Sequence, residues 1–264
     1  PQPEPEPQPQ PQPSTGGRPS AASTGVVAGT SLSSMAGGTV KTSGLIANKV
    51  ITGNATFTGD NVTLRNVRVT GHAVFRGTNV TIEDSEFGSW ALSGAKNVRA
   101  TRVEILGNPG QDGLHITSTT APVSNVVITD SYIANPKLTS GAHYDGIQVR
   151  GVTGLTLRNT VVDLGAYQSG YNSALFLEDA NGGNRDVTVE NSWLLGGGYT
   201  ISGRGQNVRI TGTTIAAGKW GYMNPNTTGI TAWSSNRNPD GATLTHSGGK
   251  ITVGATPAPT PTPT

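Results

Sequence analysis

The sequence predicts an all-β fold, a single-stranded right-handed parallel β-helix (a solenoid) of roughly nine coils flanked by disordered Pro-rich linkers. Three observations lead to this prediction. A short Asn-led unit recurs along most of the 264 residues, no helical pattern of useful length separates the copies, and Pro-rich tracts lie at both ends. A fold built of alternating strands and helices is excluded, because its crossovers need about a dozen residues each.

The repeated unit is an Asn, an alternation of apolar and polar residues, a polar kink and a second short alternation. Alternation with period two indicates a strand with one buried face, so each unit predicts two strands joined by a bend. The copies are NVTLRNVRVTG from Asn61, NVTIEDSEFG from Asn79, NVRATRVEILG from Asn97, NVVITDSYIA from Asn125, GLTLRNTVVD from Gly154, DVTVENSWLLG from Asp186 and NVRITGTTIAA from Asn207.

One such unit cannot bury its apolar face alone, whereas stacked coils form a continuous core. We expect Val, Leu and Ile to point inward and the leading Asn residues to stack as a hydrogen-bonded amide ladder. At about 4.8 Å per coil, the solenoid would be on the order of 40 Å long.

Another short strand precedes the Asn corner of each coil. If Leu114, Ile147, Leu175 and Ile201 are core residues, their outward neighbours form vertical columns. The first column is His115, Gln148, Phe176 and Ser202, and the second is Thr117, Arg150, Glu178 and Arg204.

Composition excludes several classes of protein. Charged residues make up 13% and the net charge is +2, so no nucleic-acid footprint is present. Apolar stretches are too short to span a bilayer, and the absence of Cys removes disulfides and thiolate metal sites.

The Pro-rich ends predict the domain organisation. Residues 1–20 form a Pro/Gln-rich linker, residues 21–254 the β-helix and residues 255–264 a Pro/Thr linker. This arrangement favours a secreted, extracellular monomer joined to other domains through its linkers.

The entry segment, which begins STGVVAGTSLSS, the NVTLRNV coil and the strand HYDGIQ from His143 resemble secreted actinobacterial right-handed β-helix proteins of the pectate-lyase-like superfamily. The resemblance covers about residues 18–220. It implies the fold, but the catalytic signatures of polygalacturonases and pectate lyases are absent, so neither activity carries over.

Three successive coils are longer than the others, through loops at about 107–112, 134–145 and 163–173. Insertions in a solenoid gather on one face because the core cross-section stays constant. We therefore expect these loops to form a wall beside His115, Gln148, Arg150 and Glu178, with a cleft between wall and face.

Asp112 and Asp145 each precede Gly in equivalent positions and should lie close together. Such a pair could raise one pKa for acid/base catalysis or could hold Ca²⁺. The alternative is that Asp-Gly simply makes a turn. His143, beside Asp145, is a candidate for proton transfer, and His115 for hydrogen bonding to substrate.

Arg150 could act in catalysis or bind a substrate carboxylate, and Gln148, Glu178 and Arg204 could contact substrate beside it. The alternative is a plain surface ladder of ion pairs. Among the loop aromatics, Tyr144 and Tyr171 could stack on sugar rings, as could Tyr167 and Trp220.

Two functions follow as hypotheses. In the first, the protein is a lyase or hydrolase that acts on a polysaccharide along the exposed strand face. In the second, the chain is a non-catalytic carbohydrate- or cell-wall-binding module, or a structural or adhesive spacer, of a larger protein.

Overall fold

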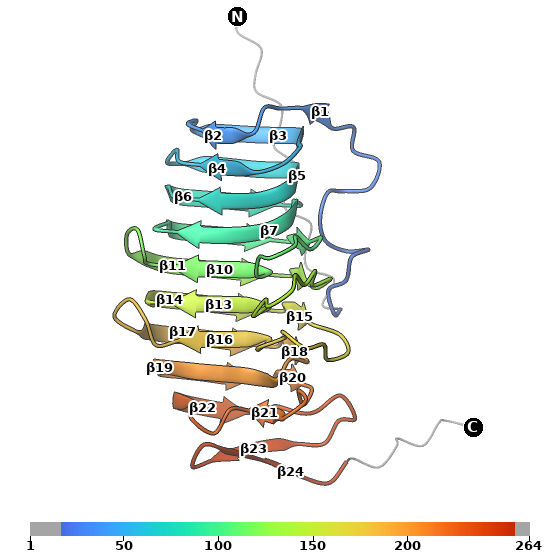
Figure 1. The fold of residues 1–264 in the computed structure, drawn as a ribbon, viewed down its shortest axis with the longest axis vertical. Helices are drawn as coiled ribbons and strands as arrows, with labels where there is room; N and C mark the ends of the chain where they lie inside the picture. Colours follow the sequence, from blue (N-terminus) through green and yellow to red (C-terminus); the bar gives the residue numbers. More distant parts are fainter. Residues whose placement is uncertain (1–16, 257–264) are drawn as a thin grey trace, which may run out of the picture.

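The computed structural model describes residues 17–256; residues 1–16 and 257–264, which belong to the predicted linkers, lie outside the described part. Between these limits the chain winds into a right-handed parallel β-helix whose coils stack along one axis (Figure 1). Twenty-two strands join in one continuous sheet, and their pairings are parallel. None of residues 17–256 belongs to a helix with the length and apolarity to cross a membrane.

Each coil contributes strands to three stacks. The first stack, which forms the candidate binding face, contains β2 (Gly38–Val40), β4 (Ala55–Phe57), β7 (Glu86–Ser93), β10 (Leu114–Thr117), β13 (Ile147–Arg150), β16 (Leu175–Glu178), β19 (Tyr199–Thr211) and β21 (Gly221–Met223).

The second stack follows the bend at the leading Asn. It contains β3 (Gly44–Ile51), β5 (Val62–Phe75), β6 (Thr78–Glu83), β8 (Lys96–Thr101), β11 (Val123–Thr129), β14 (Val152–Arg158), β17 (Asn184–Glu190) and β22 (Thr228–Ser234). The long strands β3, β7 and β19 turn a corner and take part in two stacks, and β5 takes part in all three.

The third stack follows the polar kink. It contains β1 (Ser33–Ser34), β9 (Glu104–Ile105), β12 (Tyr132–Ile133), β15 (Val161–Asp163), β18 (Trp193–Leu195) and β20 (Thr214–Ile215). An antiparallel hairpin of β23 (Leu244–Ser247) and β24 (Lys250–Val253) follows the last coil.

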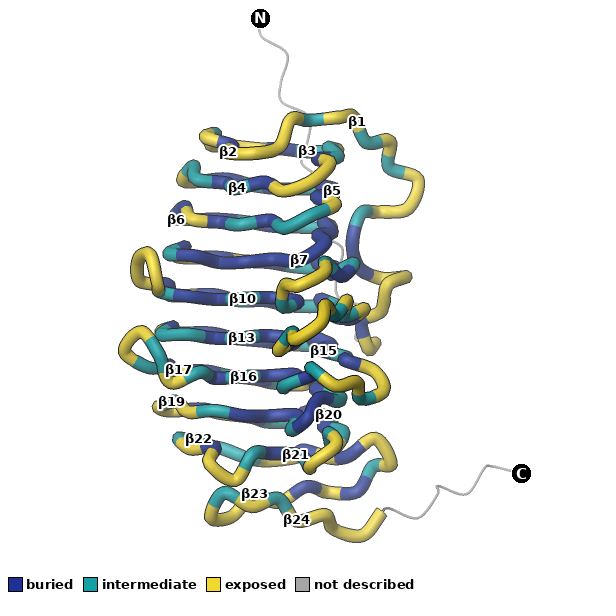
Figure 2. The backbone as a smooth tube through the Cα atoms, in the orientation of Figure 1, coloured by how far each residue is buried: buried dark blue, intermediate teal, exposed yellow. Residues whose placement is uncertain are grey.

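The core is a column of inward-facing aliphatic side chains, drawn as dark blue strands in Figure 2. Leu114, Ile147, Leu175 and Ile201 are vertical neighbours in register and are fully buried, as the alternation predicted. Polar residues between them point outward, because successive side chains in a strand alternate between faces.

The leading Asn residues form the predicted amide ladder. Nδ2 of Asn79, Asn97 and Asn125 donates to Oδ1 of the Asn one coil earlier at 2.9–3.0 Å, beginning at Asn61. These Asn residues have φ of 52–58°, a left-handed conformation that Asn tolerates and that makes the corner. Gly154 interrupts the ladder, which resumes where Asn207 donates to Asp186 at 2.7 Å.

A second ladder follows the polar kink and was not predicted. Buried hydroxyls there accept hydrogen bonds from main-chain N–H groups of neighbouring coils: Ser85 from Val67, Ser131 from Val103 and Ser192 from Thr160, each at 3.1 Å. The sequence signal is a Ser or Thr directly after the kink in most units. These hydroxyls satisfy N–H groups at a corner where the strand ladder breaks.

The N-terminal segment 17–30 runs along the side of the stack, across the third-stack corners (Figure 1). Arg18 binds Asp163 at 3.3 Å, the N–H of Gly25 donates to the carbonyl of Arg102 at 2.9 Å, and the N–H of Val27 donates to Oδ1 of Asn66 at 3.1 Å. The segment thus contacts coils that are not neighbours of one another.

Candidate functional site

The floor of the site consists of β10, β13 and β16, which lie side by side in register. His115 pairs with Gln148, and Gln148 pairs with Phe176, which confirms the geometry of the first predicted column. Thr117 and Arg150 are likewise neighbours in the second column. Side chains of one column lie about 4.8 Å apart, so a ligand along the face meets one coil after another.

The three inserted loops stack on one another and form the predicted wall. The N–H of Gly113 donates to the carbonyl of Asp145 at 3.1 Å, and the N–H of Tyr144 donates to the carbonyl of Gly170 at 2.7 Å. The loops leave the same side of the stack (Figure 2). Because main-chain hydrogen bonds link them, the wall is a continuous surface.

The opposite edge of the floor carries loops that were not predicted, at 118–122 and 179–183. Nδ2 of Asn181 spans two coils and donates to Oγ1 of Thr119 at 3.0 Å. The signal was the length of chain between Thr117 and Val123, which exceeds what a bend requires. Loops therefore border the floor on both sides.

Asp112 and Asp145 come together at the base of the wall, as their equivalent positions predicted. The N–H of Asp145 donates to Oδ1 of Asp112 at 2.9 Å. Asp145 is only 2% exposed, and its carboxyl accepts hydrogen bonds from Nδ2 of Asn172 and from the N–H of Ser173, both at 3.0 Å. Asp112 instead borders an open cavity.

Burial changes the proton affinity of both carboxyls. It raises the pKa of Asp112 to about 6. The hydrogen bond from the N–H of Asp145 lowers this pKa, and the charge of Glu178 raises it further. Burial, and then the charge of Asp112, raises the pKa of Asp145 well above its ordinary value. A carboxyl in a poorly solvated site disfavours its charged form. Asp112 therefore titrates in mildly acidic solution, and Asp145 holds a proton more strongly than an ordinary carboxyl does.

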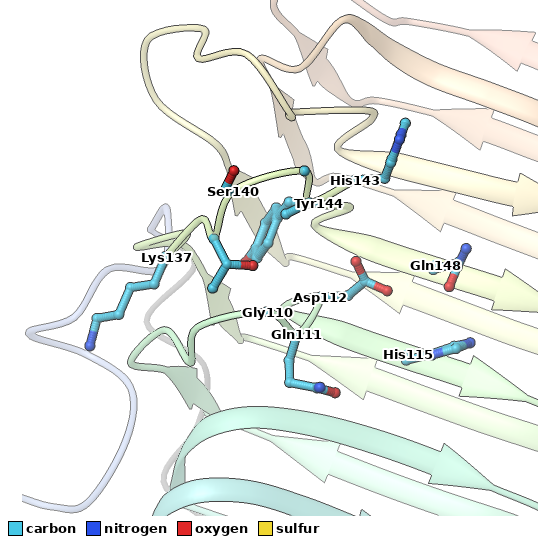
Figure 3. A pocket seen from close by; sticks show the side chains of 12 residues that line it. Gly110, Gln111, Asp112, His115, Lys137, Ser140, His143, Tyr144 and Gln148 are labelled. Atoms are coloured by element: carbon cyan, nitrogen blue, oxygen red, sulfur yellow. The ribbon is translucent and has the colours of Figure 1, made fainter.

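The cavity beside Asp112 has a volume of about 320 Å³ and lies between the loop 134–145 and the floor. Figure 3 shows Asp112, His115 and Gln148 side by side along the floor strands. His143 also borders the cavity but is exposed and points away from Asp112. The structure thus separates His143 from the Asp pair, although the two are neighbours in sequence.

His115 is a neutral imidazole at ordinary pH. Burial, and then the positive charge of Arg150, lowers its pKa to about 4. Its Nε2 atom is buried and finds no hydrogen-bond partner among residues 17–256. The imidazole itself borders the cavity, beside Asp112 and Gln148.

Arg150, Gln148 and Glu178 form one network on the floor. Nε of Arg150 lies 2.8 Å from Oε2 of Glu178, and Nε2 of Gln148 donates to the same oxygen at 3.0 Å. Arg204 does not continue this ladder; its ion pair is with Asp179, at 3.3 Å on the surface. The reason is that the pairing of β16 with β19 ends at Gly203.

Tyr144 and Tyr171 lie inside the wall instead of on its surface. They are 3% and 4% exposed, and their ring centroids are 6.1 Å apart. Neither ring offers an open face to a sugar, which corrects the expectation that they stack on substrate. The hydroxyl of Tyr144 has no hydrogen-bond partner among the described residues, and burial, followed by the charge of Asp112, raises its pKa.

Residues 49–240 match the family described as Right handed beta helix region. The chain belongs to this family. No curated protein matches the sequence.

Several solved structures are similar at low sequence identity. A surface protein and adhesin of Streptococcus pneumoniae has a TM-score of 0.48 at 11% identity, with 74% of this chain and 69% of that chain covered. Pectate lyase Pel9A has a TM-score of 0.46 at 14% identity over 80% and 65%. An alginate lyase from a Paenibacillus strain has a TM-score of 0.40 at 15% identity over 72% and 90%. These similarities concern the fold only.

Within this right-handed β-helix, sequence reasoning missed the partners of Asp145. Ser173 lies two residues before β16, as Asp145 lies two residues before β13, and Asn172 directly precedes Ser173. Ser173 in turn donates through its hydroxyl to Ser202 at 2.8 Å. The available signal was the equivalence of positions in successive coils. The Asp-Gly pattern ends at Asp145, so the equivalent residue of the next coil was not considered.

The surroundings of Asp112 and Asp145 provide few further ligands for Ca²⁺. Among residues 17–256, no group of three or more His, Asp or Glu side chains is arranged around an ion-sized gap. The carboxyl of Asp145 accepts hydrogen bonds from Asn172 and Ser173, and only Asp112 of the pair borders the cavity. The donor set therefore fits proton chemistry better than metal binding.

Proposed function

We propose that this protein binds a polysaccharide along the floor of β10, β13 and β16 and breaks a glycosidic bond in it, with Asp112 as the group that transfers the proton. One observation carries the proposal. The carboxyl of Asp112 has a pKa of about 6 and borders a cavity at the edge of an extended strand face. A carboxyl with this pKa can both give and accept a proton near its working pH.

Asp145 would act as a positioning residue. Its N–H fixes Oδ1 of Asp112, and its own buried carboxyl is held by Asn172 and Ser173. This arrangement restricts the orientation of Asp112 before a substrate arrives. A fixed catalytic group lowers the entropic barrier of the reaction.

The floor would orient the sugar chain. His115 is neutral and borders the cavity, so its imidazole can contact sugar hydroxyls there. Gln148 presents an amide next to it, in the same column. Arg150 is neutralised by Glu178, so its role here is to shape the floor rather than to bind a carboxylate alone.

A non-catalytic binding module is the second candidate, and the burial of Asp145 favours it. Cleavage by acid/base catalysis usually uses two groups on opposite sides of the bond. Here only one carboxyl of the pair borders the cavity. A binding module would use the same floor and wall and would leave the polysaccharide intact. In either case we propose a secreted protein.

The test is a panel of soluble and insoluble glycans, assayed for new reducing ends and for unsaturated products. The wild type is expected to release products. Unsaturated products indicate a lyase, and new reducing ends without unsaturation indicate a hydrolase. Asp112→Asn should reduce the rate by on the order of 100-fold or more while binding persists. Glycan binding without any product would favour the binding module. The proposal is overturned if the protein binds none of the glycans and releases no product.

A further inference from the structure

An exposed tryptophan lies beyond the Asp112 cavity, on a turn that precedes β21. Trp220 is 57% exposed, and it is the only aromatic residue among the large exposed apolar residues of the range 17–256. Gly218 and Gly221 close the turn by exchanging main-chain hydrogen bonds at 3.1 and 3.2 Å. The indole is therefore presented on a short, internally bonded turn.

This turn belongs to the same wall as the candidate site. The N–H of Asn172 donates to the carbonyl of Tyr144, that of Gly198 to Asn172, and that of Trp220 to Gly198, each at 2.8 Å. Tyr144 borders the Asp112 cavity, so this ladder leads from the cavity to Trp220 in three steps. At about 4.8 Å per coil, Trp220 lies roughly 14 Å farther along the axis than Tyr144.

Neighbouring residues hold the indole in place. A Cβ atom at Gly198 would lie 2.3 Å from the ring, so the ring rests directly on this glycine. The rings of Tyr167 and Tyr199 pack at 6.0 and 5.7 Å from that of Trp220, and Nζ of Lys219 lies 4.7 Å over the ring of Tyr167. The side chain is braced on one side and open on the other.

We propose that the open side of Trp220 is a second sugar-binding subsite for the same polysaccharide, where one pyranose ring stacks on the indole. The inference rests on the proposed function of the floor. An aromatic ring offers a flat apolar face to the C–H groups of a sugar. Since the rise per coil, about 4.8 Å, is close to the length of one pyranose in a chain, a glycan along the wall reaches Trp220 a few residues after Asp112.

A subsite at this distance acts only on chains long enough to reach it. Short oligosaccharides fill the floor near Asp112 and do not contact Trp220. Longer chains gain the additional stacking contact and bind more tightly. Affinity should therefore rise with chain length in the wild type and level off early in a variant that lacks the indole.

The test compares Trp220→Ala with wild type by affinity electrophoresis in gels that contain polygalacturonate, alginate, xylan or a β-glucan. Loss of one stacking contact should weaken retardation by the bound polysaccharide about three- to tenfold. Leu45→Ala is the matched control, because Leu45 is equally exposed, at 56%, but lies far from the wall. Trp220→Phe keeps a flat ring and should retain most of the retardation.

The subsite is supported if Leu45→Ala is retarded like wild type while the retardation of Trp220→Ala is weakened. A chain-length series of the retarding glycan should then show the early plateau in Trp220→Ala. Equal retardation of Trp220→Ala and wild type overturns the subsite and leaves the proposed function standing. If wild type and Asp112→Asn are retarded by none of the glycans, the proposed function falls and the subsite with it. Thermal unfolding verifies that each variant is folded.

Discussion

Asp112 owes its raised proton affinity to what surrounds it. Its backbone position repeats that of Asp145 one coil away, yet Asp145 is sealed beneath Asn172 and Ser173 while Asp112 meets the cavity. Two identical side chains thus differ in proton affinity and access. Pairs of carboxyls with different environments are a common basis for acid/base chemistry.

Replacing Glu178 by Gln should lower the pKa of Asp112 below about 6, because the negative charge of Glu178 contributes to its rise. The change also frees Arg150, whose positive charge acts in the same direction. The pKa is measured from the carboxyl carbon shift of Asp112 during an NMR titration. Glu190→Gln, in a surface ion pair with Arg158, is the control and should leave it unchanged. An unshifted midpoint in Glu178→Gln would contradict the assigned cause.

The sequence could place the two Asp residues together but could not tell which of them is buried. Proximity follows from the repeat, since both precede Gly in successive coils. Burial depends on the direction of the Asn172 side chain and on the packing of Tyr144 in the wall, and no periodicity encodes either. The same limit explains why Tyr144 was expected to meet substrate.

Among the elements, the amide ladder has a gap at Gly154 that can be closed. Gly154 has φ of 77°, which Asn tolerates, and a Cβ atom there would meet Oδ1 of Asn125 at an ordinary 3.4 Å. Gly154→Asn combined with Asp186→Asn would join the two halves of the ladder. We expect the free energy of unfolding to rise by about 0.5–1.5 kcal/mol, measured by urea denaturation.

Two single variants serve as controls for the ladder. Gly154→Ala places a side chain in the same left-handed conformation without an amide and should destabilise by about 1 kcal/mol. Asp186→Asn keeps its bond to Asn207 and should change stability little. A double variant no more stable than Gly154→Ala would show that the ladder adds nothing to stability.

The N-terminal segment encloses a pair of acidic residues, which predicts a dependence of stability on pH. Gly25 covers Glu104 and Glu86 so closely that a Cβ atom would lie 2.7 and 2.9 Å from their carboxyl oxygens. Burial, and then the charge of Glu86, raises the pKa of Glu104 to about 7. A raised carboxyl pKa means that the folded state binds more protons, so stability falls as the pH rises from about 4.5 to about 7.

Glu104→Gln should remove this loss. The variant is expected to exceed wild type by on the order of 1–3 kcal/mol in its free energy of unfolding at about pH 8 and to match it at about pH 4. Urea denaturation at both pH values measures the difference. Glu83→Gln, which breaks a partly buried pair with Arg65, should give no gain at either pH. An equal gain at both pH values would refute the role of ionisation.

At the scale of the whole molecule, the repeat was enough to predict the winding, the core residues and the side of the wall. These features recur in every coil, so a single sequence displays them many times. The N-terminal segment and the hairpin of β23 and β24 occur once each, and their contacts are set by side chains far away in the chain. Nothing in a periodic pattern could reveal these two features.

The path of the N-terminal segment bears on how this protein comes apart. Where every layer touches only the layers beside it, loosening can start at one end and travel inward a layer at a time. Residues 18–27 instead connect Asp163 directly with Arg102 and Asn66. We expect these links to favour a concerted opening of the first layers over gradual fraying, because losing any of them releases a contact shared with layers much deeper in the stack.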